Sequence, residues 1–82
     1  MTREEVFQAL NEVFRDNFDD EDITLTETTV ADDIEEWDSL EHINLIIAIE
    51  ERFGMKFTMK EVTGMKNVGE MVDIILDRGT RI

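Results

Sequence analysis

The chain lacks cysteine and tyrosine, has a single histidine, and carries far fewer basic than acidic residues. Without cysteine it forms no disulfide, offers no thiolate to a metal and has no cysteine nucleophile. One histidine, with no glycine-rich phosphate loop and no Gly-x-Ser-x-Gly segment, leaves too few groups for a catalytic centre. We therefore expect a protein that is not an enzyme.

Charge and hydropathy argue against proteins that bind nucleic acid or anionic membranes and against proteins that span a membrane. Eight Lys and Arg against 21 Asp and Glu give a net charge of −13, which disfavours binding to nucleic acid or to an anionic membrane. The longest apolar run, Leu45 to Ile49, is far shorter than the roughly 18 residues that cross a bilayer. The segment Met1–Glu5 lacks the basic and apolar stretches of a signal peptide, so we expect a cytoplasmic protein.

The length of 82 residues predicts a single domain over residues 1–82. No sustained alternation of polar and apolar residues indicates a strand. Capping residues instead bound four helical segments: Arg3–Asp16 after a Thr2/Glu5 capping box, Ser39–Phe53 between Asp38 and Gly54, a short one opened by Thr58 and Glu61 and interrupted by Gly64, and one from Asn67 to Gly79. The expected fold is an all-α four-helix bundle with a short third helix, in which residues 80–82 fray.

A long loop, residues 17–37, separates the first two helices. Its composition is acidic and rich in threonine, but apolar residues are scattered through it: Ile23, Leu25, Val30, Ile34 and Trp37. These residues favour an ordered loop that lies across the core rather than a disordered one.

The second helix has apolar residues on two sides. The larger arc is the expected core face: Leu45, Ile49, His42, Phe53 and Ile46. His42 on this face is expected to be a partly buried structural residue. Leu40 and Ile47 lie on the opposite side, where they either form a docking strip for a partner or are covered by the long loop.

Acidic residues are concentrated in one part of the chain. Fourteen of the 21 lie between Asp16 and Glu51, a stretch without Lys or Arg. The stretch predicts a strongly negative surface, which either keeps the protein in solution or steers basic partner proteins toward it.

Ser39 opens the second helix directly after Asp38 and before Leu40. A hydroxyl at this position can point outward, where the unpaired N–H groups of a helix start favour a phosphate. With this Asp-Ser-Leu segment, the acidic second helix ending in Glu50-Glu51-Arg52-Phe53-Gly54, and the helix order, the chain resembles acyl carrier proteins of the phosphopantetheine-carrying family over nearly its full length.

The resemblance implies that Ser39 receives a covalent 4′-phosphopantetheine arm from coenzyme A, transferred by a phosphopantetheinyl transferase (carrier-protein synthase). Asp38 would help to hold the magnesium ion used in that transfer, and Leu40 flanks the attachment site. The arm would carry acyl groups as thioesters between loading, transferring and synthase enzymes with basic patches, in fatty-acid-like or specialised biosynthesis. Positions that match the family's docking surface are Leu40, Glu41, Asn44, Ile47, Glu50 and Glu51.

By the same resemblance, an acyl chain would be sheltered by core-facing residues: Ile46, Ile49, Phe53, Val62 and Ile75. The chain departs from the fatty-acid carriers at Asn44, where they have an acidic residue, and in a third helix that carries Lys60. A carrier of amino acids remains open, as does an acidic helical adaptor without a prosthetic group. In either case a monomer is expected, because the net charge opposes self-association.

Overall fold

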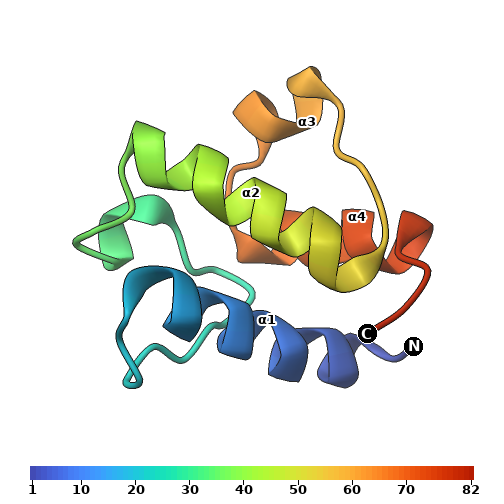
Figure 1. Cartoon of the computed structure of the whole chain (residues 1–82), viewed down its shortest axis with the longest axis horizontal. Coiled ribbons are helices and arrows are strands. Elements are labelled where there is room, and N and C mark those ends of the chain that lie inside the picture. Colours follow the sequence, from blue (N-terminus) through green and yellow to red (C-terminus); the bar gives the residue numbers. More distant parts are fainter.

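The computed structural model describes every residue, Met1–Ile82, and contains four α-helices and one 3-10 helix. The helices are α1 (Arg3–Phe18), α2 (Ser39–Phe53), α3 (Met59–Gly64) and α4 (Val68–Arg78), and the 3-10 helix η1 is Ala31–Asp33. The predicted all-α four-helix class is confirmed. Figure 1 shows α2 across the middle of the molecule, with α1 on one side, the short α3 on the other, and both chain termini at one end.

Local capping sets where the helices begin. The capping box at α1 joins Thr2 and Glu5 through two hydrogen bonds of 3.1 and 2.7 Å. A second box joins Thr58 and Glu61 before α3, and the Asn67 side chain caps α4. Each cap satisfies an amide that has no partner within its own helix, so all of these predicted helix starts are confirmed.

The end of α1 differs from the prediction. The helix continues two residues past Asp16, because Phe18 still packs into the core and only Asp19 turns into the left-handed region, at φ 50°. Phe18 lies 6.0 Å from Phe14 and 6.3 Å from Trp37 between ring centroids. Burial of this aromatic ring thus extends the helix into what the sequence pattern assigned to the loop.

The core lies between α1, α2, α4 and the long loop. Its buried members are Val6, Ala9, Leu10, Val13, Phe14, Phe18, Ile23, Leu25, Ile34, Leu45, Ile49, Phe53, Met55, Val68, Met71, Val72 and Ile75. Three of them come from the long loop, which confirms that this loop is ordered across the core. The loop also contains η1, which the sequence pattern did not indicate.

Polar contacts hold the long loop in place from both sides. On the α1 side, Asn11 accepts a hydrogen bond from the Leu25 amide (2.8 Å), and the Arg15 guanidinium donates to the Ile23 carbonyl (2.7 Å). On the α4 side, the first two amides of the helix donate to loop carbonyls at 2.9 Å each, Val68 to Thr29 and Gly69 to Glu27. The loop therefore satisfies amides at the start of α4 that have no partner in their own helix.

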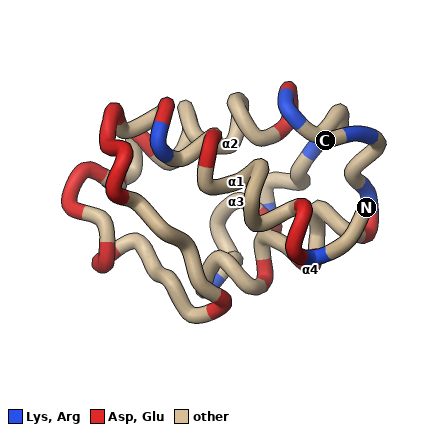
Figure 2. The backbone as a smooth tube through the Cα atoms, turned by 90° about the horizontal axis from the view of Figure 1, so that it is seen from below, with Lys and Arg blue, Asp and Glu red and all other residues tan.

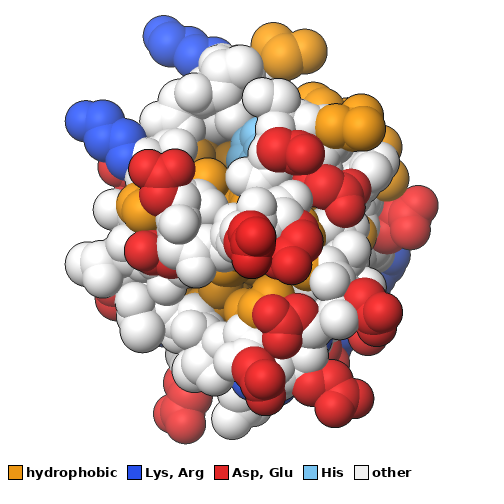
Figure 3. Space-filling view, turned by 90° about the vertical axis from the view of Figure 1, so that its left-hand side faces the viewer, with side chains coloured by type: hydrophobic (Ala, Val, Ile, Leu, Met, Phe, Trp, Pro, Cys, Tyr) orange, Lys and Arg blue, Asp and Glu red, His pale blue; other side chains and the backbone are white.

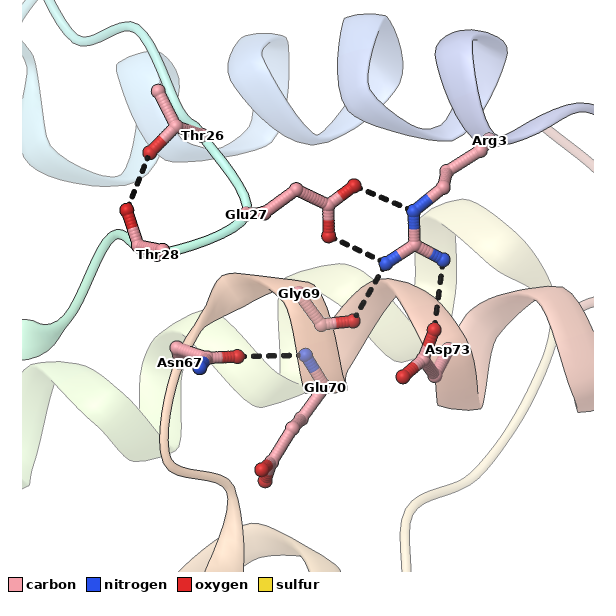
Figure 4. A network of polar contacts seen from close by, with 8 residues as sticks. All are labelled: Arg3, Thr26, Glu27, Thr28, Asn67, Gly69, Glu70 and Asp73. Carbon is pink, nitrogen blue, oxygen red and sulfur yellow. Dashed lines mark hydrogen bonds and ion pairs between the residues drawn. The ribbon is translucent and has the colours of Figure 1, made fainter.

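Arg3 ties three segments together at this junction (Figure 4). Its guanidinium forms ion pairs with Glu27 of the loop (2.6 Å) and Asp73 of α4 (2.7 Å), and it also donates to the Gly69 carbonyl (3.2 Å). The hydrogen bonds that Arg3 donates to Glu27 lower the pKa of this carboxyl group from its usual value. A side chain at position 69 would meet the Glu27 carbonyl oxygen at 2.7 Å, so the close approach of loop and helix requires glycine there.

Thr80 and Arg81 are held by hydrogen bonds, so the prediction that they fray is wrong. The amides of Thr80 and Arg81 donate to the Phe53 carbonyl at 2.8 and 3.2 Å, and the Thr80 hydroxyl donates to the Gly54 carbonyl at 2.7 Å. The Arg81 guanidinium donates to the Glu51 carbonyl (2.6 Å). Carbonyls at the end of a helix lack hydrogen-bond partners within it. Residues 80–82, which we call the C-terminal tail, supply donors to these carbonyls of α2.

None of the helices combines the length and the hydropathy that a membrane span requires.

Candidate functional site

Ser39 is exposed at the first position of α2, and the residue before it supplies the helix cap. The Asp38 carboxylate accepts a hydrogen bond from the Glu41 amide (2.8 Å). Since Asp38 fills the capping role, the Ser39 hydroxyl is not needed to start the helix. The hydroxyl therefore lies at a helix start with no capping role of its own to fulfil.

A pocket of about 630 Å³ opens beside Ser39, between the start of α2, the long loop and α3. Its volume lies within the roughly 300–1,000 Å³ typical of small-molecule sites. Its lining is mainly apolar: Val30, Ala31, Trp37, Ile43, Met59, Val62, Met65 and Met71, with Asp38, Ser39, His42, Thr63, Lys66 and Asn67. The arrangement can hold an apolar group attached at or near Ser39.

The residues predicted to shelter an acyl chain and the lining of this pocket have only one member in common. Of the five predicted residues, Val62 alone lines this pocket. The others are buried elsewhere in the interior, with exposed fractions of 5 % for Ile46 and 0 % for Ile49, Phe53 and Ile75. Ile49, Phe53 and Ile75 belong to the close-packed core, so the open space beside Ser39 lies nearer the surface than these residues do.

Trp37 and His42 form one wall of the pocket as a stacked, hydrogen-bonded pair. The Trp37 indole N–H donates to His42 Nδ1 (3.0 Å), and the two rings stack with centroids 5.9 Å apart. An indole nitrogen is only a donor, so Nδ1 is the acceptor and the proton of the neutral imidazole lies on Nε2. Nε2 then donates to the Val62 carbonyl of α3 (2.9 Å). The structural role predicted for His42 is confirmed.

The exposed side of α2 carries an apolar stripe. Leu40 is 73 % exposed, and Ile43 and Ile47 are 50 % exposed. The long loop therefore does not cover Leu40 and Ile47, and the prediction of an uncovered strip is confirmed. Ile43 belongs to the same stripe because it lies one helical turn from Leu40, a spacing that the sequence already contained.

The four polar residues assigned to the docking surface differ in their surroundings. Glu51 is exposed, and the Asn44 amide donates to the half-buried Glu41 carboxylate (2.8 Å). The Glu50 side chain is only 15 % exposed and accepts a hydrogen bond from the Phe57 amide (2.8 Å). Glu50 thus has an internal role in holding the segment after α2.

Charge is unevenly distributed over the molecule. Figure 2 shows acidic positions along the long loop and basic positions near both termini, and in Figure 3 acidic side chains gather over the face formed by the loop and the start of α2. The ion pairs engage Arg3, Arg52, Lys56 and Arg78, but neither Lys60 nor Lys66 beside the pocket. The surface around Ser39 is therefore acidic on the α2 side and carries unpaired lysines on the α3 side.

The chain is similar to several acyl carrier proteins over almost its full length. It is 35 % identical to the acyl carrier protein of Rubrobacter xylanophilus, covering 98 % of this chain and 99 % of that one, and 34 % identical to that of Coprothermobacter proteolyticus, covering 92 % of each. The solution NMR structure of a holo acyl carrier protein from Geobacter metallireducens is 43 % identical over 88 % of this chain and 83 % of its own, with a TM-score of 0.83. No family model matches the chain.

Proposed function

Because the chain belongs to the acyl carrier protein family, we propose that Ser39 bears a 4′-phosphopantetheine arm and that the protein presents acyl groups on it as thioesters. The observation that carries this proposal is the exposed Ser39 hydroxyl at the start of α2, next to an apolar pocket, with Asp38 filling the capping role. Ser39 is also the only serine in the chain. The arm supplies a thiol, the nucleophile that a chain without cysteine lacks.

The surroundings of Ser39 suit a phosphodiester. Attachment forms a bond between Ser39 Oγ and a phosphorus of coenzyme A and breaks the pyrophosphate bond, so that adenosine 3′,5′-bisphosphate leaves and the serine proton is released. The amides at the start of the 15-residue helix α2 favour the anion. One Asp38 oxygen, Oδ1, accepts the capping bond, which leaves Oδ2 for a magnesium ion during transfer.

The pocket beside Ser39 is the proposed shelter for the acyl group. Transfer of a hydrocarbon chain from water to this apolar lining is favourable. Val62, Met65 and Met71 line it, and it opens to solvent beside Ser39, so a chain held by the arm can enter without an opening of the core.

The exposed side of α2 is the proposed docking surface for partner enzymes. The stripe of Leu40, Ile43 and Ile47 supplies apolar contact, and Glu41 and Glu51 flank it. Carboxylates at the rim of an interface steer basic patches toward it and speed association more than they tighten binding. The proposed partners are a phosphopantetheinyl transferase and enzymes that load, transfer or extend acyl groups.

In this proposal the chain is one domain and a non-catalytic carrier for fatty-acid-like or specialised biosynthesis. The proposal gives it no chemistry of its own, because partner enzymes act on the tethered thioester. A cytoplasmic location and a monomeric state stay predictions.

The proposal is tested by intact mass. The apo protein is incubated with coenzyme A, magnesium and a broad-specificity phosphopantetheinyl transferase, beside Ser39→Ala and Thr63→Ala. Thr63 lines the same pocket with a hydroxyl, so it is the matched control. We expect one added phosphopantetheine in the wild type and in Thr63→Ala, and none in Ser39→Ala. A folded wild type that gains no mass refutes the carrier role and favours the acidic adaptor.

A further inference from the structure

The pocket beside Ser39 has one wall that is held less firmly than the others. This wall is α3, which contains no buried residue and exposes 75 % of Met59. Polar contacts join it to the other helices at two points. Glu61 pairs with Arg78 of α4, and the Val62 carbonyl accepts a hydrogen bond from His42 of α2. Phe57 and Met65 on either side of α3 pack against the core, but the helix itself buries no side chain, so these two contacts are the polar ones that fix its position.

The His42 contact is the one that spans the pocket. His42 and Val62 both line it, His42 from the α2 side and Val62 from the α3 side. The Val62 carbonyl lies in the last turn of α3, where a helix leaves its carbonyls without internal partners. The imidazole Nε2–H at 2.9 Å supplies that partner.

A series of contacts connects this hydrogen bond to the core. The fully buried Phe14 ring meets Trp37 edge-on, with centroids 5.2 Å apart, and Trp37 stacks on His42. The Trp37 indole donates to Nδ1 and so leaves the proton on Nε2, where the Val62 carbonyl needs a donor. The imidazole is thus fixed in both orientation and tautomer.

We propose that His42 is a positioning residue that holds α3 over the pocket and thereby sets the length of acyl chain that the pocket shelters. The proposal rests on the proposed function, because it concerns cargo attached to Ser39. His42 forms no bond to the cargo. With the hydrogen bond intact, α3 is a fixed wall. Without it, α3 moves away from α2, and a chain in the pocket loses contacts on that side.

The test compares variants loaded with acyl chains of increasing length. His42→Leu removes both hydrogen bonds at similar size. His42→Gln is the conservative rescue, since its amide both accepts from Trp37 and donates to Val62. Trp37→Phe removes the indole donor. Lys60→Ala is the control, because Lys60 is an exposed residue of α3 that does not line the pocket. A phosphopantetheinyl transferase loads each protein from acetyl-, butyryl-, hexanoyl- and octanoyl-coenzyme A, and intact mass confirms loading.

The measurement is the thermal unfolding midpoint of each acyl form relative to the holo form. In the wild type, Lys60→Ala and His42→Gln we expect the midpoint to rise by about 3–6 °C for each methylene that the pocket buries. In His42→Leu and Trp37→Phe we expect less than half of that rise. A residue that only stabilises the fold would lower all midpoints equally and leave the dependence on chain length unchanged.

Hydrogen exchange of the holo forms is the second measurement. The amides of Val62–Lys66 should exchange on the order of tenfold faster in His42→Leu than in the wild type, whereas amides in the middle of α1 should not change. Should His42→Leu fail to fold, Trp37→Phe and His42→Gln show whether loss of the hydrogen bond reduces the dependence on chain length or leaves it unchanged.

Three results would overturn the inference. A chain-length dependence in His42→Leu equal to that of the wild type would show that the hydrogen bond does not set the pocket. A wild type that loads but shows no dependence would reject the inference and leave the arm on Ser39 in place. A wild type that takes no acyl-phosphopantetheine would reject the proposed function together with this inference.

Discussion

Among the glycines that are not in close contact with a backbone atom, Gly54 should be the one whose substitution by alanine destabilises the protein most. Gly54 ends α2 at φ 61°, in the left-handed region. A side chain there costs about 1–2 kcal/mol from backbone strain alone. An added Cβ would also clash with the Thr80 hydroxyl and lie 2.9 Å from the Arg81 guanidinium, so the C-terminal tail must move.

Movement of the tail adds to the cost. The tail donates five hydrogen bonds to the end of α2, among them Thr80 to the Phe53 carbonyl at 2.8 Å and Arg81 to the Glu51 carbonyl at 2.6 Å. Each is worth about 0.5–1.5 kcal/mol, and exposed ones lie at the lower end. Alanine also restricts the unfolded chain, which raises the free energy of unfolding by about 0.4–1 kcal/mol and offsets part of this loss. We expect a net loss of about 2–4 kcal/mol.

The assay is urea unfolding followed by circular dichroism, with Gly64→Ala as the matched control. Gly64 is the last residue of α3, and an added Cβ there meets nothing within 4 Å. The same chemical change should therefore be neutral, or stabilising by up to about 1 kcal/mol. With a slope near 1 kcal/mol per molar urea, the midpoint of Gly54→Ala should fall by about 2–4 M, or the protein should unfold without urea.

Deletion of residues 80–82 separates the two causes. In the truncated protein, Gly54→Ala should cost only the strain less the effect on the unfolded chain, a net loss of at most about 1.5 kcal/mol. A Gly54→Ala protein within about 0.5 kcal/mol of the wild type would refute both the left-handed turn and the docked tail. If Gly54→Ala costs as much stability in the truncated protein as in the full chain, the docked tail alone is refuted.

Three further predictions concern charge and packing. The Arg78 guanidinium and the Thr58 amide lower the pKa of Glu61 from 4.5 to about 2, so this pair stabilises the fold above pH 4.5 and loses its effect as the pH falls toward 2. The stability difference between the wild type and Arg78→Gln should accordingly shrink over that range in denaturant titrations, and a difference independent of pH would contradict it. The net charge of −13 predicts that sodium chloride raises the thermal midpoint, and a flat or falling midpoint across an ionic-strength series would reject self-repulsion as a destabilising force. Phe14→Ala should cost about 3–5 kcal/mol because its ring is fully buried against Phe18 and Trp37, whereas loss of less than 1 kcal/mol in calorimetry would mean that the core repacks.

Much of the fold could be predicted because the deciding contacts are local. Thr2, Asp38, Thr58 and Asn67 each cap an amide three residues further along the chain. A spacing of three is visible in the sequence and is the same in every helix start, so the beginnings of the helices follow from the residues. The position of Ser39 at the start of α2 is predictable for the same reason, whereas its role as the attachment site follows from the resemblance to the carrier family.

The ends of segments were less predictable than their beginnings. The sequence pattern indicated an end of α1 at Asp16 and a frayed tail after Gly79. In the structure, Phe18 keeps α1 helical because it packs on Trp37, and Thr80 stays ordered because it meets Phe53. Both partners lie far away along the chain, so a local pattern contains no sign of them.

The sequence by itself determined the helical class, the helix starts and the acidic surface, and it placed Leu40 and Ile47 on the side of α2 away from the core. Only the tertiary structure decided which apolar residues line a pocket and which fill the core. It also decided that His42 lies between Trp37 and the Val62 carbonyl, and that the tail docks on α2. The physical reason is that periodicity shows which face of a helix turns inward, whereas free space and hydrogen-bond partners arise from how distant segments pack against that face.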